Sequence, residues 1–132
     1  MGARVDGKIA IVTGAGSVGT GIGNGKAAAL LYSREGARVV LSDLNLNSAQ
    51  ETQHIIEKEG GDCISIQADV SDSNDCANLV SKTIEHYGRI DILHNNVGIE
   101  IPGGILEISE DDWDKTLAVN LKSVFLMCFF PV

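Results

Sequence analysis

The chain has 132 residues, of which 44% are hydrophobic and 21% are charged, and its formal net charge is −8. This length corresponds to one folded domain rather than two, and the composition excludes a disordered chain. The negative charge argues against a nucleic-acid partner held through its phosphates, because such binding needs a basic face.

Short apolar runs alternate with helical patterns along the whole chain. We predict strands at residues 8–13, 37–41 (running on to Asp43), 63–67 and 90–93. We predict helices at 26–35, from a capping box of Ser48 and Glu51 to the glycines at 60–61, at 72–87, and from Ser109 onward. This alternation indicates parallel strands, right-handed crossovers and helices on both faces. Residues 1–132 are therefore predicted to form a single α/β domain.

No segment of the sequence indicates a membrane or an export signal. The longest apolar run, 124–132, is far shorter than the roughly 20 residues that cross a bilayer. The three cysteines, Cys63, Cys76 and Cys128, are odd in number and widely spaced, which is typical of reduced thiols. Neither cysteines nor histidines show metal-ligand spacing, so no metal site is expected. We therefore expect a cytoplasmic protein without a membrane partner.

A glycine-rich segment follows the first predicted strand and precedes the first predicted helix. Two frames are open: one is the G-x-G-x-x-G spacing of Gly14, Gly16 and Gly19, and the other is Gly21-Ile22-Gly23 at the helix entrance. Glycines let the backbone approach a pyrophosphate, while the helix N-terminus supplies N–H groups and a partial positive charge. The alternative is a merely flexible turn. The strand and helix on either side favour a dinucleotide-binding loop.

Asp43 ends the second predicted strand, 20 residues after Gly23. This spacing fits the acid that holds the adenosine ribose in dinucleotide-binding domains. A carboxylate accepts hydrogen bonds from both ribose hydroxyls and repels a 2′-phosphate, so Asp43 favours NAD over NADP, with NADP still possible. The alternative is a solvated aspartate at a strand end.

Four motifs occur in a fixed order: Thr13-Gly14 with Gly21-Ile22-Gly23, Ala68-Asp69-Val70, Asn95-Asn96-Val97-Gly98, and Val119-Asn120-Leu121-Lys122. Together they resemble the short-chain dehydrogenase/reductase family, from about residue 5 to residue 128. The resemblance implies a Rossmann-type doubly wound parallel sheet, truncated here after about four strands and the following helix. It also implies an NAD(P)-dependent oxidoreductase that interconverts an alcohol and a ketone by hydride transfer.

The resemblance further implies roles for single residues. Ile22 would lie beside the pyrophosphate, Asp69 would bind the adenine amino group above Val70, and Asn95 would lie over the adenosine ribose. Asn120 matches the family's catalytic asparagine, which holds a water in a proton relay. Lys122 matches a position sometimes found among cofactor contacts, although an exposed helix lysine is the simpler interpretation. The implied cofactor-binding set is Gly14, Gly21, Ile22, Gly23, Asp43, Asp69, Val70, Asn95 and Gly98.

Asn120 also stands out by its spacing alone. It falls inside an apolar stripe of helical period, and an amide on a buried face needs partners or costs about 1–3 kcal/mol. A structural asparagine bonded to neighbouring backbone is the equal alternative. The stripe consists of Trp113, Leu117, Leu121, Val124 and Cys128.

The sequence departs from the family pattern in three ways. Six residues, 15–20, separate Gly14 from Gly21-Ile22-Gly23 where the family has three, and Val97 replaces an alanine. The family's catalytic serine and Tyr-x-x-x-Lys pair are missing, because Tyr32 and Tyr87 are followed at the lysine position by Gly36 and Asp91. The chain as given is therefore expected to be truncated and inactive. The alternative function is a non-catalytic nucleotide-binding or subunit-interaction module.

The family's strand order predicts the first strand in the centre, the second and third on one side and the fourth on the other. Residues 90–93 then form an edge strand with unpaired backbone groups, which is a template for association. The full-length family implies a homo-oligomer, and we expect this chain to self-associate or to depend on a full-length partner subunit.

Overall fold

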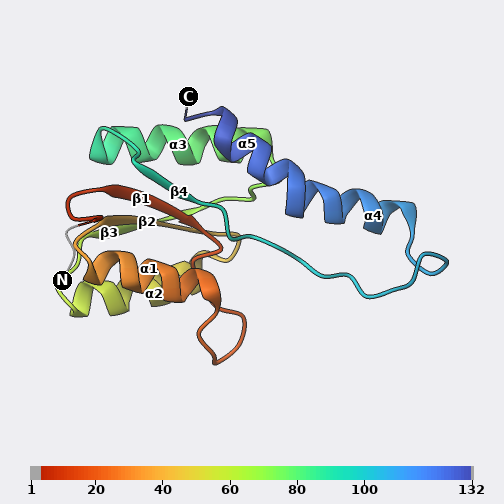
Figure 1. Ribbon diagram of the computed structural model, residues 1–132, viewed down its shortest axis with the longest axis horizontal. Helices are drawn as coiled ribbons and strands as arrows, with labels where there is room; N and C mark the ends of the chain where they lie inside the picture. Colours follow the sequence, from red (N-terminus) through yellow and green to blue (C-terminus); the bar gives the residue numbers. More distant parts are fainter. Residues whose placement is uncertain (1–3, 132) are drawn as a thin grey trace.

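The computed structural model describes residues 4–131 and shows a parallel sheet covered on both faces by helices (Figure 1). The strands are β1 (Ile9–Thr13), β2 (Arg38–Asp43), β3 (Cys63–Gln67) and β4 (Ile92–His94). The α-helices are α1 (Asn24–Arg34), α2 (Leu46–Lys58), α3 (Ser73–Tyr87), α4 (Glu110–Leu117) and α5 (Ser123–Phe129), with a π-helical segment η1 (Ala118–Lys122) joining the last two. The alternating strand and helix pattern of the sequence is confirmed.

The strand order is β3-β2-β1-β4, and every neighbouring pair is parallel. Val12 of β1 pairs with Leu41 of β2 on one side and with His94 of β4 on the other. The carboxyl ends of all four strands therefore meet at the same edge of the sheet, where ligands bind in open α/β sheets. The predicted α/β fold with a doubly wound parallel sheet is confirmed.

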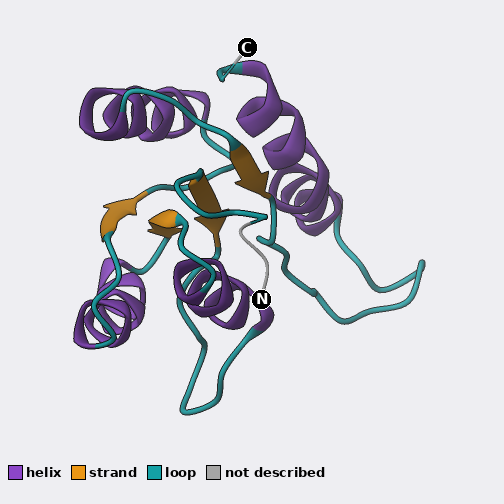
Figure 2. Cartoon of the chain, turned by 60° about the vertical axis from the view of Figure 1, so that its left-hand side comes forward, coloured by secondary structure: helices purple, strands orange, loops and turns teal. Residues whose placement is uncertain are grey.

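Helices lie on both faces of the sheet (Figure 2), and two apolar layers hold them to it. On one face, Val39, Leu41 and Val12 pack with residues of α1 and α2 such as Ala29 and Ile56. On the other face, residues of β1 and β2 pack with α3 and α5 in a cluster of Ile11, Val40, Ile66, Leu79, Leu126 and Met127. Successive strand residues alternate between the layers, as the pleat of a strand requires.

Three elements begin two residues away from the sequence prediction, and the first of them is α1, which begins at Asn24 rather than at 26. Helix α2 begins at Leu46, and its N-cap is Asn45, whose side chain accepts from the Ser48 N–H, so Ser48 caps nothing. Strand β4 begins at Ile92 rather than at 90, because the Ile9 N–H donates to the Asp91 carboxylate at 2.8 Å instead of to a strand carbonyl. That N–H, together with Arg89, holds the pKa of Asp91 below its ordinary value.

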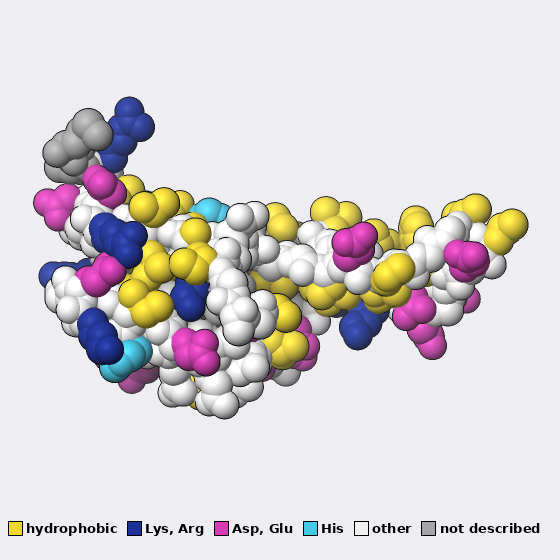
Figure 3. All heavy atoms as spheres, turned by 90° about the horizontal axis from the view of Figure 1, so that it is seen from below, with side chains coloured by type: hydrophobic (Ala, Val, Ile, Leu, Met, Phe, Trp, Pro, Cys, Tyr) yellow, Lys and Arg dark blue, Asp and Glu magenta, His cyan; other side chains and the backbone are white. Residues whose placement is uncertain are grey.

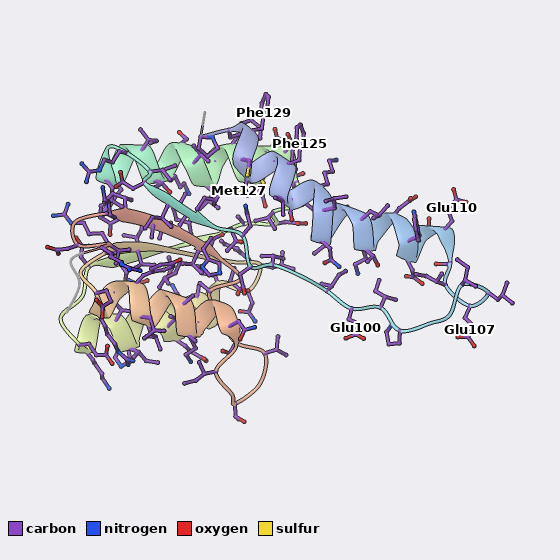
Figure 4. The ribbon with its side chains drawn as sticks, in the orientation of Figure 1. Glu100, Glu107, Glu110, Phe125, Met127 and Phe129 are labelled. Atoms are coloured by element: carbon purple, nitrogen blue, oxygen red, sulfur yellow. The ribbon has the colours of Figure 1, made fainter. Side chains whose placement is uncertain are left out.

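The predicted last helix is divided by a π-helical turn, and its apolar stripe is not buried. The face that packs on the sheet is formed by Ser123, Leu126 and Met127. Figure 4 shows Met127 directed toward the sheet, while Phe125 and Phe129 point away from it. Helices α4 and α5, joined by η1, form a helical rod, and Cys128 on it is exposed. The exposed large apolar side chains of this rod are Trp113, Leu117, Leu121, Val124, Phe125 and Phe129.

Residues 98–109 and α4 project from the body as an arm (Figures 1 and 3). Ile105 and Leu106 near its end are 84% and 96% exposed. The 124–132 run ends in Val132, which lies outside the described residues. Among residues 4–131, no helix is both long and apolar enough to span a bilayer.

Two of the three thiols are buried in the apolar layers. Burial raises the pKa of Cys63 to about 12 and that of Cys76 to about 11, with help from neighbouring carboxylates. A thiol with so high a pKa holds almost no thiolate at neutral pH, and thiolate is the reactive form. Cys63 and Cys76 are therefore structural side chains.

Candidate functional site

A cavity of about 1120 Å³ opens at the carboxyl ends of the strands. One wall is the glycine loop between β1 and α1, and the opposite wall is the start of the arm with α4 and η1. The ends of β2 and β3 form the third side. The polar and charged residues at its lining include Ser17, Asn24, Asp43, Asn45, Ser48, Asp69, Asn96, Glu100 and Lys115.

The N-terminus of α1 faces this cavity without a side-chain cap. Its N-cap residue is Gly23, and the first turn holds no acidic residue. The first intrahelical bond comes from the Ala27 N–H to the Gly23 carbonyl, so the N–H groups of Asn24, Gly25 and Lys26 have no partner within the helix. Such a terminus offers donors and a partial positive charge to an anion.

Two glycines let α1 pack directly on the end of β1. Gly14 has φ +65°, in the left-handed region that glycine adopts without strain. Gly25 is buried, and a Cβ there would stand 2.0 Å from the Gly14 carbonyl oxygen. Of the two frames, Gly21-Ile22-Gly23 is the one that leads into the helix, while Gly16 is wedged where a Cβ would stand 2.4 Å from Ser48 Cβ.

The Asp43 carboxylate already holds two backbone N–H groups. Its Oδ2 accepts from the Gly16 N–H and its Oδ1 accepts from the Asn45 N–H, each at 2.9 Å. Asp43 therefore ties the glycine loop to the end of β2. Each carboxylate oxygen keeps further acceptor capacity toward the cavity, because an ionised carboxylate has about four acceptor positions.

Asp69 and Val70 lie at the end of β3, on the same side of the cavity as Asp43. The Ser71 N–H and hydroxyl both donate to Asp69 Oδ1, at 2.9 and 2.6 Å. These two bonds orient the carboxylate and leave Oδ2 without a partner among the described residues. Val70 is buried and forms an apolar floor beside it.

Asn96 lines the cavity, whereas the neighbouring Asn95 does not. Asn95 Nδ2 lies 3.8 Å from Cys128 Sγ, and Asn95 does not line the cavity. Asn96 Nδ2 donates to the Gly14 carbonyl at 3.2 Å, and the Asn96 N–H donates to Thr13 Oγ1 at 3.1 Å. The place of Asn95 over the adenosine ribose therefore stays a prediction. Strand alternation is the signal that separates two adjacent asparagines, and it depends on the exact register of β4.

Both ends of the Asn120 side-chain amide hydrogen-bond to the backbone of one residue, Ile99. Its Oδ1 accepts from the Ile99 N–H at 2.7 Å, and its Nδ2 donates to the Ile99 carbonyl at 2.8 Å. Asn120 is exposed rather than buried and sits in the π-helical segment η1, with Oδ1 3.7 Å from a Cβ built on Gly98. Its observed contact is the backbone bonding that the alternative interpretation expected.

Two lysines of the helical rod have different surroundings. Lys115 lines the cavity, whereas Lys122 lies on the opposite side, beside the exposed apolar groove of Leu117, Leu121 and Phe125. Lys122 therefore has no contact with the cavity, which fits the simpler interpretation of an exposed lysine.

Comparisons with known proteins agree with this geometry. The family profile described as short chain dehydrogenase matches residues 8–130. An "uncharacterized oxidoreductase" of Thermotoga maritima is 43% identical over 96% of this chain and 47% of its own length. The (2S)-[(R)-hydroxy(phenyl)methyl]succinyl-CoA dehydrogenase subunit BbsD of Thauera aromatica is 36% identical over 92% of this chain and 47% of its own.

Solved structures show the same similarity. A hydroxysteroid dehydrogenase from Escherichia coli matches with a TM-score of 0.90 and 31% identity, over 98% of this chain and 52% of that one. A short chain dehydrogenase from Mycobacterium avium matches with a TM-score of 0.89 and 36% identity, over 98% and 47%. The chain thus spans about half the length of the relatives that it matches.

Proposed function

The chain belongs to the short chain dehydrogenase family, and from this we propose that it binds a nicotinamide dinucleotide for an alcohol–ketone oxidoreduction. The observation that carries the proposal is the uncapped N-terminus of α1, which faces a cavity of about 1120 Å³. Because Gly25 packs directly on Gly14, this terminus lies close to the end of β1. A volume of that order holds a ligand the size of a dinucleotide. The residues present therefore fit the cofactor.

The adenosine half of the dinucleotide and its pyrophosphate have proposed partners. Asp43 accepts from the ribose hydroxyls, and Asp69 accepts from the adenine amino group above Val70. The pyrophosphate lies at the N–H groups of Asn24 and Gly25, beside Gly14, Gly21, Ile22 and Gly23, with Gly98 at the far wall. When bound there, the reduced dinucleotide would donate a hydride to a ketone, and the oxidised form would accept one from an alcohol.

NAD is the proposed cofactor. Asp43 would face a 2′-phosphate with a like charge. The two segments on this side of the cavity, 14–25 and 43–48, contain no lysine or arginine that would offset a 2′-phosphate. NADP remains the weaker alternative.

The proposed part of Asn120 in the reaction is positional. By clamping both backbone groups of Ile99, it fixes the chain that leaves β4 and so the far wall of the cavity. An amide has no useful pKa near 7, so Asn120 cannot be the acid or base of a proton transfer. The Tyr-x-x-x-Lys pair that the family resemblance gives this task is absent from the sequence, so we propose that the 132-residue chain binds the cofactor without turning over substrate.

Calorimetric titration of the 132-residue protein with NADH and with NADPH tests this proposal. We expect saturable binding of NADH, weaker binding of NADPH, and no production of NADH from NAD with simple alcohols. Tighter binding of NADPH would contradict the cofactor preference. Absence of binding by either dinucleotide would contradict the proposed function as a whole.

The second proposed function is a subunit-interaction module, and the exposed apolar rod of α4, η1 and α5 favours it. Phe125 and Phe129 are 62% and 60% exposed, and burying one such ring stabilises by roughly 1.5–3 kcal/mol. Strand β4 adds an unpaired edge beside this rod. Both features favour association with a second copy of the chain.

Sedimentation velocity of the purified chain tests the association. We expect a dimer or larger species, shifted toward monomer by Phe125→Asp. Ile105→Asp is the matched control, since Ile105 is also an exposed apolar side chain but lies in the loop before α4 and not on the rod. A monomeric wild-type protein would contradict the interaction function.

A further inference from the structure

The glycine loop has a base that is firmly bonded to the body. The Ala15 N–H donates to the Ser42 carbonyl at 3.0 Å, and the buried Thr52 hydroxyl donates to the Ala15 carbonyl at 2.8 Å. The next residue, Gly16, donates its N–H to Asp43 Oδ2 at 2.9 Å. Residues 14–16 are thus fixed to β2 and α2.

A single bond closes the neck of the loop, and the tip beyond it is free. The Gly23 N–H donates to Ser17 Oγ at 2.9 Å, which joins the two ends of the loop. Between them, no hydrogen bond joins residues 18–22 to the rest of the described chain, and residues 19–20 form a turn of their own. Gly19 has φ +76°, and Cβ atoms built at Gly19 or Gly21 would meet nothing within 4 Å. The tip can therefore move about its neck without breaking packing.

The tip carries an apolar side chain at the rim of the cavity. Val18 is fully exposed, with a relative accessibility of 105%, and Ile22 and Leu44 on the same rim are 66% and 67% exposed. Three exposed apolar side chains around one cavity are a surface that gains from being covered. Within the described chain, nothing covers them.

The position of residues 14–16, at the base of the glycine loop, decides which half of a dinucleotide the loop tip faces. Gly16 is bonded to Asp43 and wedged against Ser48, and Leu44 follows directly. These residues form the adenosine side of the cavity, opposite the wall of Glu100 and Lys115. The face of an adenine ring and the C–H side of a ribose are both apolar surfaces that a valine can contact.

We propose that residues 18–22 close over the adenosine half of the bound dinucleotide and that Val18 packs against it. This inference rests on the proposed function, because it needs a dinucleotide in the cavity. It makes the lengthened loop a contributor to cofactor affinity rather than a passive insertion.

Calorimetric titration with ADP-ribose, which carries the adenosine half and the pyrophosphate but no nicotinamide, tests the contact. We expect Val18→Ser to weaken binding roughly three- to tenfold, as loss of a partly buried valine contact would. Ile105→Ser removes another exposed apolar side chain, outside the cavity, and should bind as the wild type does. Val18→Ala, with a smaller loss than Val18→Ser, gives a second measure.

Hydrogen exchange of the loop amides supplies a readout that does not depend on affinity. Saturating ADP-ribose should slow exchange at residues 18–22 in the wild type, because a closed tip excludes water. If the wild type binds ADP-ribose but Val18→Ser binds equally well and the tip stays unprotected, the closure is overturned and the proposed function stands. If the wild type binds no ADP-ribose, both fail together.

Discussion

Gly25→Ala should lower the free energy of unfolding by about 1–3 kcal/mol, the usual cost of forcing an extra methyl group into a packed site. The new Cβ would stand 2.0 Å from the Gly14 carbonyl oxygen and 2.5 Å from Asn96 Nδ2. The first neighbour is backbone, so α1 must move away from β1. Alanine's better helix propensity, worth about 1 kcal/mol, does not offset this displacement. Thermal and urea unfolding of the purified variant measure the loss.

Gly21→Ala is the matched control for this substitution. Gly21 belongs to the same loop, yet a Cβ there meets nothing within 4 Å, and its φ lies outside the left-handed region. Its free energy of unfolding should stay within about 0.5 kcal/mol of the wild-type value. Equal stabilities of the two variants would mean that α1 does not approach β1 as closely as described.

The elements of the fold were predictable because their signals are local. Strand β1 is an apolar run that ends at a glycine, and α3 ends at Gly88, whose φ of 83° is the left-handed C-cap that the sequence implies. The strand order followed from the family resemblance and is confirmed. The N-cap of α2 was mispredicted because Asn45 and Ser48 are both good capping residues three positions apart, and only the backbone decides between them.

The site was less predictable, since its contacts join distant parts of the chain. Asn95 and Asn96 are chemically identical, and only the register of β4 assigns one to Cys128 and the other to Gly14. The apolar stripe around Leu121 was expected to be buried, but periodicity shows that a face is apolar and not what covers it. Asn120, in the π-helical turn, bonds to Ile99, which lies 21 residues away, and spacing along the helix does not show such a partner.

Asp43→Ala should weaken NADH binding by about 1.5–3 kcal/mol, the worth of hydrogen bonds to a charged group. This corresponds to a roughly 10- to 150-fold rise in Kd. The carboxylate is expected to hold the ribose, and it also fixes the Gly16 and Asn45 N–H groups. Removing it should also reduce the preference for NADH over NADPH, because the repulsion of a 2′-phosphate is lost. Calorimetric titration with both cofactors measures the two effects.

A cycle with the 2′-deoxyadenosine analogue of NADH separates ribose recognition from loop fixation. The wild type should bind the analogue more weakly than NADH, because Asp43 loses one of its ribose partners. The Asp43→Ala variant has no carboxylate to bond the 2′-hydroxyl, so it should bind NADH and the analogue equally. If the analogue were weakened by the same factor in both proteins, Asp43 would act only by fixing Gly16 and the loop. The ribose would then be recognised elsewhere in the cavity.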